Sequence, residues 1–385
     1  MNYVWYITCT KENTVLELKR NKQIFKMIGM QVRKVPQIKK GLIHCINFFL
    51  EYKMIFIGAL RRNPAYFKHV FNSKIIAKPG TLSFKGGAFN PGALIIDENT
   101  ILLLAKSQVM PWFKARGKNR KYFLVGNPVI FLLDLNSLKT VKEEIITDVS
   151  GFPENQDYVI EDLRLFYWKG KKMINHSYIF KEQVGEFLTQ SSVASAISVL
   201  EDQNNNVCFY AIPKLDFPAQ NIEKNWVYKE YDNKLFLFYS LHPYRVLVLD
   251  DQGDFGFKTI INKSLEWKLN NDGTSGNMIS FSTNPIDFDE KYWVLIIHQF
   301  TVKSFGRCYD HWAVLINKET LLPEKITAKP IFTGMGARGR TPGIRYISSI
   351  LKVENDILFF AGEGDVYVTV TKKPIKELES LFIDL

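Results

Sequence analysis

The sequence predicts an all-β protein: a five-bladed β-propeller at residues 81–385, preceded by a small α/β cap at residues 1–80. From residue 82 onward, short runs rich in Ile, Leu, Val, Phe and Tyr alternate with turn clusters such as DENT, DLNS and DDQGD. Such runs are typical of short strands joined by tight turns. Aromatic residues make up 14% of the chain, which also favours strands. Segments of similar layout then recur along the chain, as they do in repeat architectures.

The first 80 residues differ from the rest in charge. They read as a strand at residues 3–8, a helix at 14–30 and a further apolar part, and they carry a net charge of +12, whereas the whole chain carries +11. The main body therefore has no basic stripe, which argues against nucleic-acid binding. Residues 41–60 are apolar, but Glu51 and Lys53 near their middle make a membrane span costly. Peripheral contact with anionic lipid and packing against the body both stay open.

The cysteines predict a reducing compartment. The four cysteines lie far apart in the sequence and show no metal-ligand spacing with each other or with His. We therefore expect no metal and no cofactor. Residues 1–9 lack the basic start and the small-residue cleavage site of a signal peptide, so the sequence predicts a cytoplasmic protein. It does not indicate an oligomeric state.

The predicted strands fall into five units. Each unit opens on a polar–aromatic or Gly-containing motif, at residues 89–92, 161–164, 223–226, 273–276 and 343–346. The strands follow at 93–96, 101–105, 129–134, 163–168, 172–178, 234–240, 245–249, 293–298, 311–316, 357–361 and 366–371. Intervals of roughly 50 to 70 residues suit a four-stranded blade with loops. In a ring of blades the inner strands bring these openings to one axial funnel, where we expect the functional site.

Three segments resemble a known family. GGAFNPGALIIDENTILLLAKS is similar to the FNPGA…LLLR opening of glycoside hydrolase family 130, VIEDLRLFYWKGKKMINHSYI resembles its EDPR segment, and FFAGEGDVYVTVTKKPIKELESL resembles its closing blade. EKNW…LFLFYSLHPYRVL and IIHQF…RCYDHWAVLINKETLLP resemble the broader propeller superfamily. The resemblance spans residues 84–381. Leu163 and Lys106 stand where the family has Pro and Arg. The resemblance implies the activity of a β-mannoside phosphorylase or hydrolase, or that of a related β-1,2-mannosyltransferase.

By this resemblance, Asp162 matches the catalytic Asp of the family. Glycosyl transfer passes through an oxocarbenium-like state, so the leaving oxygen needs a proton donor or the acceptor needs a base. Glu161 is expected to face the opposite side of its strand. The alternative for Asp162 is a carboxylate that satisfies a turn and pairs with Arg164.

Further polar residues are candidates for substrate binding. Asn90 either directs its amide toward sugar hydroxyls or caps the Pro91-Gly92 turn. Anions and sugars need convergent cations and donors, for which the candidates are Lys224, His242, Arg245, His298, Arg307 and Tyr309. The openings and the closing segment add Arg164, Glu223, Asn225 and Asp365. Each His has a structural alternative. Trp226 and Trp312 are stacking platforms or core residues, and residues 334–343 read as a flexible rim loop.

Three functions follow as hypotheses. The first is an inverting glycosyltransferase that forms β-linked mannosyl glycans, taking a nucleotide sugar or a sugar 1-phosphate as donor and a glycan as acceptor. The second is a phosphorylase that cleaves β-mannosides with inorganic phosphate. The third is a glycan-binding propeller without catalysis. The first two need the same proton-handling carboxylate, and the third does not.

Overall fold

The computed structural model describes residues 72–79, 86–108, 127–146, 149–151, 158–184, 187–201, 205–220, 222–250, 255–267, 269, 278–303, 306–334, 337–339 and 343–385. These residues all belong to one compact unit, Glu51–Leu385. The predicted cap, apart from residues 72–79, lies outside the described residues, as does the opening at 273–276. No helix among the described residues is long and apolar enough to cross a membrane.

The described strands form five separate sheets, here numbered I to V. Sheet I contains β2 (Gly87–Asp97), β3 (Thr100–Gln108), β4 (Pro128–Asp134) and β5 (Thr140–Ile145). Sheet II contains β6 (Val149–Ser150), β7 (Tyr158–Trp168), β8 (Lys171–Val184), β9 (Phe187–Leu200) and β10 (Val207–Ala211). Sheet III contains β11 (Lys214–Leu215), β12 (Val227–Tyr231), β13 (Lys234–Leu241), β14 (Tyr244–Asp250) and β15 (Gly256–Lys263).

Sheets IV and V come from the last third of the chain. Sheet IV contains β16 (Met278–Phe281), β17 (Ile286–Asp287), β18 (Tyr292–Lys303), β19 (Gly306–Asn317), β20 (Pro323–Thr327), β21 (Phe332–Thr333) and β25 (Phe382–Asp384). Sheet V contains β22 (Arg345–Val353), β23 (Asp356–Glu363), β24 (Tyr367–Pro374) and β1 (Lys74–Ala77). The short helix α4 (Ile375–Glu379) follows β24. The all-β prediction is thus confirmed for the described part of the chain.

Local sequence explains the hairpins within the sheets. In sheet III, Asp232 and Asn233 join β12 to β13 and have φ values of 50° and 56°. Two-residue hairpins of this kind need left-handed backbone, which Asp and Asn tolerate better than most residues. Residues 232–234, DNK, are a turn cluster of the same polar kind as those noted in the sequence, and they form this turn.

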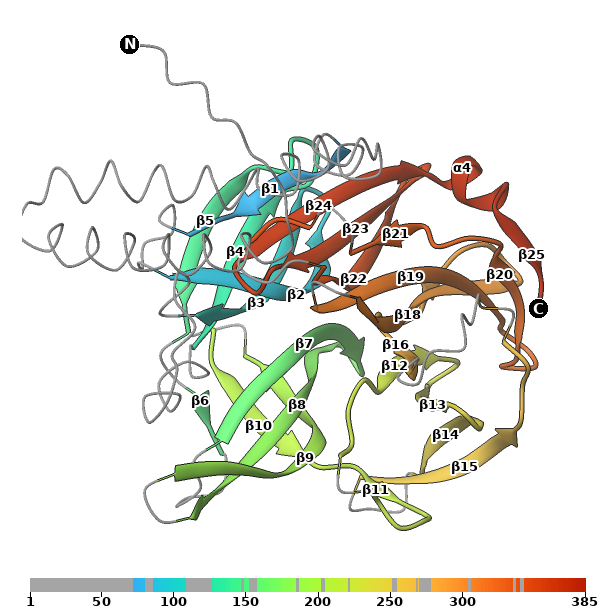
Figure 1. Cartoon of the computed structure of the whole chain (residues 1–385), viewed down its shortest axis with the longest axis horizontal. Helices are drawn as coiled ribbons and strands as arrows, with labels where there is room; N and C mark the ends of the chain where they lie inside the picture. Colours follow the sequence, from blue (N-terminus) through green and yellow to red (C-terminus); the bar gives the residue numbers. More distant parts are fainter. Residues whose placement is uncertain are drawn as a thin grey trace, which may run out of the picture. The chain divides into compact units, whose positions relative to one another are not determined.

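Apolar clusters join the sheets in a closed order. The five clusters of buried apolar residues pack sheet I on II, II on III, III on IV, IV on V, and V back on I. This is the arrangement of a β-propeller, and Figure 1 shows the sheets following one another in chain order. Strand β1 pairs antiparallel with β24, so a segment from before sheet I completes sheet V. The ring therefore closes through strands from both ends of the described chain.

The inner strands of sheets I and II approach each other closely at Gly92. A Cβ atom on Gly92 would lie 2.9 Å from the main-chain nitrogen of Leu165 and 3.0 Å from Cα of Arg164. Only glycine permits such a close backbone approach without a shift of the neighbouring strand. The glycine of the FNPG motif therefore brings the two segments that contain Asn90 and Asp162 side by side.

Candidate active site

Asn90 and Asp162 contact each other at two equivalent bulges. The pairing of β2 with β3 shifts register between Phe89 and Gly92, and that of β7 with β8 shifts between Glu161 and Arg164. Asn90 and Asp162 lie within these bulges with φ values of 49° and 55°, in the left-handed region that Asn and Asp enter most readily.

The contact itself is a side-chain hydrogen bond. Asn90 Nδ2 donates to Asp162 Oδ1 at 3.0 Å. The other carboxylate oxygen of Asp162 accepts no hydrogen bond from a described residue, and the side chain is only partly buried. Neighbouring Glu161 instead pairs with the buried amino group of Lys106 on β3. The two adjacent carboxylates thus differ: Glu161 pairs with a cation, whereas Asp162 is held by a neutral amide and keeps one oxygen available for a further hydrogen bond.

Arg164 organises the surroundings of Asp162. It is 2% exposed, and its Nε donates to the main-chain oxygen of Ser282 at 2.6 Å. Its Nη1 donates to the main-chain oxygen of Asp162 at 3.0 Å, and its Nη2 donates to Asn225 Oδ1 at 3.3 Å and to the hydroxyl of Tyr346. Arg164 therefore contacts Asp162 through the backbone of the bulge, whereas the expected alternative was a pair between the two side chains.

Tyr346 and Asn225 complete this set of contacts. The Tyr346 hydroxyl donates to Asn225 Oδ1 at 3.2 Å while it accepts from Arg164. Burial raises the pKa of Tyr346; the charge of Arg164 lowers it and that of Asp162 raises it. The hydroxyl therefore keeps its proton at neutral pH and acts as a donor.

His298 lies beside the same group as a neutral imidazole. Its Nδ1 is 2.9 Å from the Ser282 hydroxyl, and its ring packs edge-on against Tyr346 with 5.1 Å between the centroids. Burial, together with the charges of Arg164 and Lys224, lowers the pKa of His298 to about 3. Lys224 itself is exposed. The site thus combines a neutral His with a cation that faces solvent.

All five sheets contribute to what we call the central polar cluster. Its members are Asn90 on β2, Asp162 and Arg164 on β7, Asn225 before β12, Ser282 after β16, His298 on β18 and Tyr346 on β22. Each of the four predicted openings that the structure describes provides at least one member. The openings therefore meet as expected from a ring of blades.

Two predicted binding residues belong to a separate cluster beside sheet III. Buried Glu223 accepts hydrogen bonds from the Tyr239 hydroxyl and from the main-chain nitrogen of Gln220, both at 2.7 Å. The guanidinium of Arg245 lies 4.1 Å from the ring centroid of Phe217 and 5.6 Å from that of Tyr239. None of these contacts joins Glu223 or Arg245 to the central polar cluster.

Three of the remaining candidates take different positions. His242 is exposed in the turn between β13 and β14, before Pro243. Tyr309 on β19 packs against His298 with 5.6 Å between the ring centroids, so it borders the central polar cluster. Asp365 is partly buried in the turn between β23 and β24, with a φ of 61°. The side chain of Arg307 lies outside the described residues.

The two tryptophans lie in the core. Trp226 and Trp312 are each 3% exposed and belong to the apolar clusters that join sheets II to III and III to IV. A stacking platform for sugars needs an exposed ring face. Of the two roles that the sequence left open for these residues, the packing role is the one observed.

Sequence reasoning missed Tyr346 and Ser282. Tyr346 did lie within the last opening motif, residues 343–346, so its position in that repeat was an available signal. Ser282 lies beyond the end of the fourth opening, and nothing in the sequence marks it. Its main-chain oxygen and hydroxyl become significant only because Arg164 and His298 contact them.

Solved structures that share this fold include enzymes that act on mannosides or transfer mannose. No protein-family model and no curated protein sequence matches the chain. A β-1,2-mannobiose phosphorylase from Listeria innocua, in complex with β-1,2-mannobiose, matches with a TM-score of 0.54 and 16% identity. The match covers 80% of this chain and 96% of that one. A glycoside hydrolase of family 130 that targets β-1,2 mannosidic linkages matches with a TM-score of 0.54 and 12% identity, over 76% of this chain and 86% of that one. The chain has a glycoside hydrolase family 130-like fold.

Two proteins of Leishmania mexicana share this fold. A GDP-Man-dependent mannosyltransferase matches with a TM-score of 0.51 and 12% identity, over 83% of this chain and 94% of that one. A mannose phosphorylase in complex with phosphate ion matches with a TM-score of 0.51 and 8% identity, over 80% and 91%. The family 130-like propeller thus occurs both in phosphorylases and in a transferase, and at these identities the likeness concerns the fold.

Proposed function

We propose that the chain is an inverting glycosyltransferase that forms β-linked mannosyl glycans, with Asp162 as its acid/base. The observation that carries the proposal is the Asp162 carboxylate in the central polar cluster, held by Asn90 at 3.0 Å and with one oxygen available. A carboxylate fixed by a neutral donor keeps a defined direction, which proton transfer to or from a sugar oxygen requires.

In the proposed reaction the hydroxyl oxygen of a glycan acceptor attacks the anomeric carbon of the donor. The bond between that carbon and the donor phosphate oxygen breaks, and the phosphate leaves with the electron pair. Asp162 takes the hydroxyl proton as the new carbon–oxygen bond forms. Asn90 orients the carboxylate, and Arg164 holds the bulge in place through the main-chain oxygen of Asp162.

The residues around Asp162 suit a phosphorylated donor. Lys224 is exposed, and its charge reaches His298, which is neutral and can donate a hydrogen bond. An exposed ammonium beside neutral donors favours a phosphate group. Because a GDP-Man-dependent mannosyltransferase has the same fold, we propose a nucleotide sugar as the donor and a mannosyl glycan as the acceptor. His242, Arg245, Arg307, Tyr309, Glu223 and Asp365 remain predicted substrate contacts.

A phosphorylase that cleaves β-mannosides with inorganic phosphate is the second candidate. Two solved phosphorylases favour it, one in complex with β-1,2-mannobiose and one with phosphate ion. In that reaction Asp162 protonates the leaving sugar oxygen, and phosphate attacks the anomeric carbon. Both candidates use Asp162 in the same position, so the direction of transfer distinguishes them.

The surrounding architecture completes the proposal. We propose that each of sheets I to V is one blade, because the apolar clusters join them in closed order. We propose a cytoplasmic location, with the basic segment at residues 1–80 as a cap that contacts the membrane peripherally. The net charge of +12 in that segment and the wide spacing of the four cysteines along the sequence support this placement.

The test is incubation of the purified full chain with two sets of substrates. One set contains GDP-mannose or mannose 1-phosphate with mannosyl oligosaccharides, and the other contains β-1,2-mannobiose with inorganic phosphate. Transfer that lengthens the oligosaccharide supports the transferase, and release of mannose 1-phosphate only in the presence of phosphate supports the phosphorylase. If neither product forms, or if Asp162→Asn retains full turnover, the enzymatic proposal is wrong. Glycan binding that Asp162→Ala leaves unchanged would then favour the non-catalytic alternative.

A further inference from the structure

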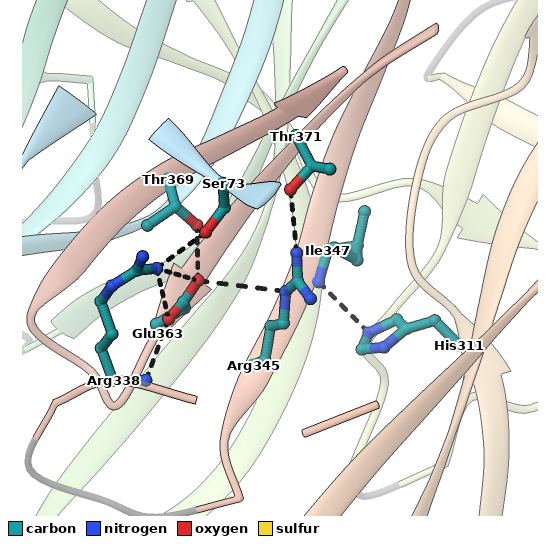
Figure 2. A network of polar contacts seen from close by, with 8 residues as sticks. All are labelled: Ser73, His311, Arg338, Arg345, Ile347, Glu363, Thr369 and Thr371. Carbon is teal, nitrogen blue, oxygen red and sulfur yellow. Dashed lines mark hydrogen bonds and ion pairs between the residues drawn. The ribbon is translucent and has the colours of Figure 1, made fainter. Parts of the chain in front are cut away.

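A buried carboxylate lies between two buried arginines at the end of β23. Glu363 is 0% exposed, and the side chains of Arg338 and Arg345 are 3% and 2% exposed. Arg338 Nη1 lies 3.3 Å from both carboxylate oxygens, and the main-chain nitrogen of Arg338 donates to Oε2 at 2.9 Å. Arg345 Nε lies 4.0 Å from Oε1, to which the Thr369 hydroxyl donates at 2.8 Å. Figure 2 shows that the Glu363 carboxylate contacts the guanidinium groups of both Arg338 and Arg345.

Arg338 fixes a segment that is bound to Tyr309 on both sides. Before it, the Gly334 N–H donates to the main-chain oxygen of Tyr309 at 2.5 Å, and after it, Gly343 accepts from the Tyr309 N–H at 3.1 Å. A Cβ atom on Gly364 would lie 2.4 Å from the main-chain oxygen of Arg338. Residues 334–343 were predicted to form a flexible rim loop, but Arg338 in their middle is buried and bonded to Glu363.

Arg345 fixes the first residues of β22. Its Nη2 donates to the Thr371 hydroxyl at 3.0 Å, and its guanidinium stacks on Phe332 at 4.3 Å from the ring centroid. The next residue, Tyr346, donates to Asn225 in the central polar cluster. The one after it, Ile347, donates its N–H to His311 Nε2 at 3.2 Å. The position of Arg345 therefore sets where the Tyr346 hydroxyl lies.

The residue before Glu363 contacts Asn90 directly. A Cβ atom on Gly362 would lie 2.2 Å from Oδ1 and 2.5 Å from the main-chain nitrogen of Asn90. Asn90 therefore occupies the space that a side chain at position 362 would need. Residues 362–364 thus touch the partner of Asp162 on one side and Arg338 on the other.

We infer that Glu363 is a positioning residue for the central polar cluster, acting through Arg338 on Tyr309 and through Arg345 on Tyr346. A buried ion group costs desolvation energy and is weak evidence of a gain in stability; one role known for such groups is to fix a geometry. Here the geometry comprises residues 343–346 and 362–364, which contact members of the cluster, and residues 337–339, which Glu363 binds through Arg338. That this arrangement serves catalysis rests on the proposed function. The effect of Glu363 on the positions of Tyr309 and Tyr346 does not depend on that function.

The test that needs no substrate is amide hydrogen exchange of the full chain. Glu363→Gln removes the charge and one acceptor but keeps the shape of the side chain. We expect faster exchange in residues 308–312 and 343–350, and unchanged exchange in residues 227–250 of sheet III. The matched control is Glu377→Gln, an exposed glutamate of α4 that pairs with Lys373. Unchanged exchange at residues 343–350, or an equal rise in all sheets, would overturn the inference.

A milder variant and an activity measurement separate positioning from folding. Thr369→Val removes a single hydrogen-bond donor to Glu363 and should accelerate amide exchange in the same segments to a smaller extent. If Glu363→Gln does not fold, the exchange of Thr369→Val tests the inference in its place. On the substrate that the wild type converts, Glu363→Gln should lower kcat about 10²-fold, the cost of a misplacement of about 1 Å, while amide exchange in residues 227–250 of sheet III stays unchanged. A rise in KM with an unchanged kcat would contradict positioning, because it would mean that Glu363 affects only substrate binding. If the wild type converts nothing, the proposed function fails and the exchange result still stands.

Discussion

Replacing Arg164 with Met should destabilise the chain, because the guanidinium connects four sheets. The change keeps most of the side-chain volume but removes every donor. Asn225 and Tyr346 keep the hydrogen bond that they make with each other. The main-chain oxygens of Ser282 and Asp162 lose their charged donor, which lies at 2.6 and 3.0 Å. At about 1.5–3 kcal/mol for each bond to a charged donor, the expected loss is about 4 kcal/mol.

The measurement is the thermal unfolding midpoint by circular dichroism. For a chain of 385 residues, about 4 kcal/mol corresponds to roughly 5 °C. The matched control is Arg245→Met, because Arg245 stacks on Phe217 and Tyr239 and loses only about 1 kcal/mol of cation–π attraction, or roughly 1 °C. Equal shifts for the two variants would refute the role assigned to Arg164.

Two predictions concern pH. Burial raises the pKa of Asp287, but hydrogen bonds from Lys229 at 2.7 Å and Lys318 at 2.8 Å outweigh it and hold the pKa at about 2. Because the folded-state pKa is depressed from 3.8, this carboxylate stabilises the fold above about pH 4 and loses that effect as the pH falls to about 2. Asp287→Asn should therefore lower the melting temperature at pH 7 and flatten its fall between pH 4 and 2; an unchanged acid limb would refute this. The imidazole of His298, with a pKa of about 3, should show no NMR titration between pH 8 and 5, and a midpoint near 6.5 would contradict its burial.

The sequence was sufficient for the parts of the site that depend on local structure. Asn90 and Asp162 each lie in a short motif that forms a bulge, and left-handed backbone at both positions suits Asn and Asp. Gly92 marks a close approach of two strands. The recurrence of such openings along the chain predicted that they meet at one centre, and the described openings do so.

The sequence could not reveal the contacts that depend on ring closure. Arg164 bonds to Tyr346 across 182 residues and to Ser282 across 118, and no local pattern connects them. Glu363 follows the apolar run ILFFAG on β23, where its charge gave no sign of the two arginines that surround it. The roles of Trp226 and Trp312 were undecided because buried and exposed aromatic residues look alike in sequence.

The central claim is that the Asp162 carboxylate handles the proton of a sugar–oxygen bond, and the rate of sugar transfer by Asp162→Asn tests it most directly. Asp232→Asn is the matched control, since Asp232 also has a positive φ of 50° but lies exposed in the turn between β12 and β13. Asp162→Asn should lower kcat by about 10²–10⁴-fold at an unchanged melting temperature, while Asp232→Asn should turn over at the wild-type rate. Equal rates for the two variants would contradict that claim.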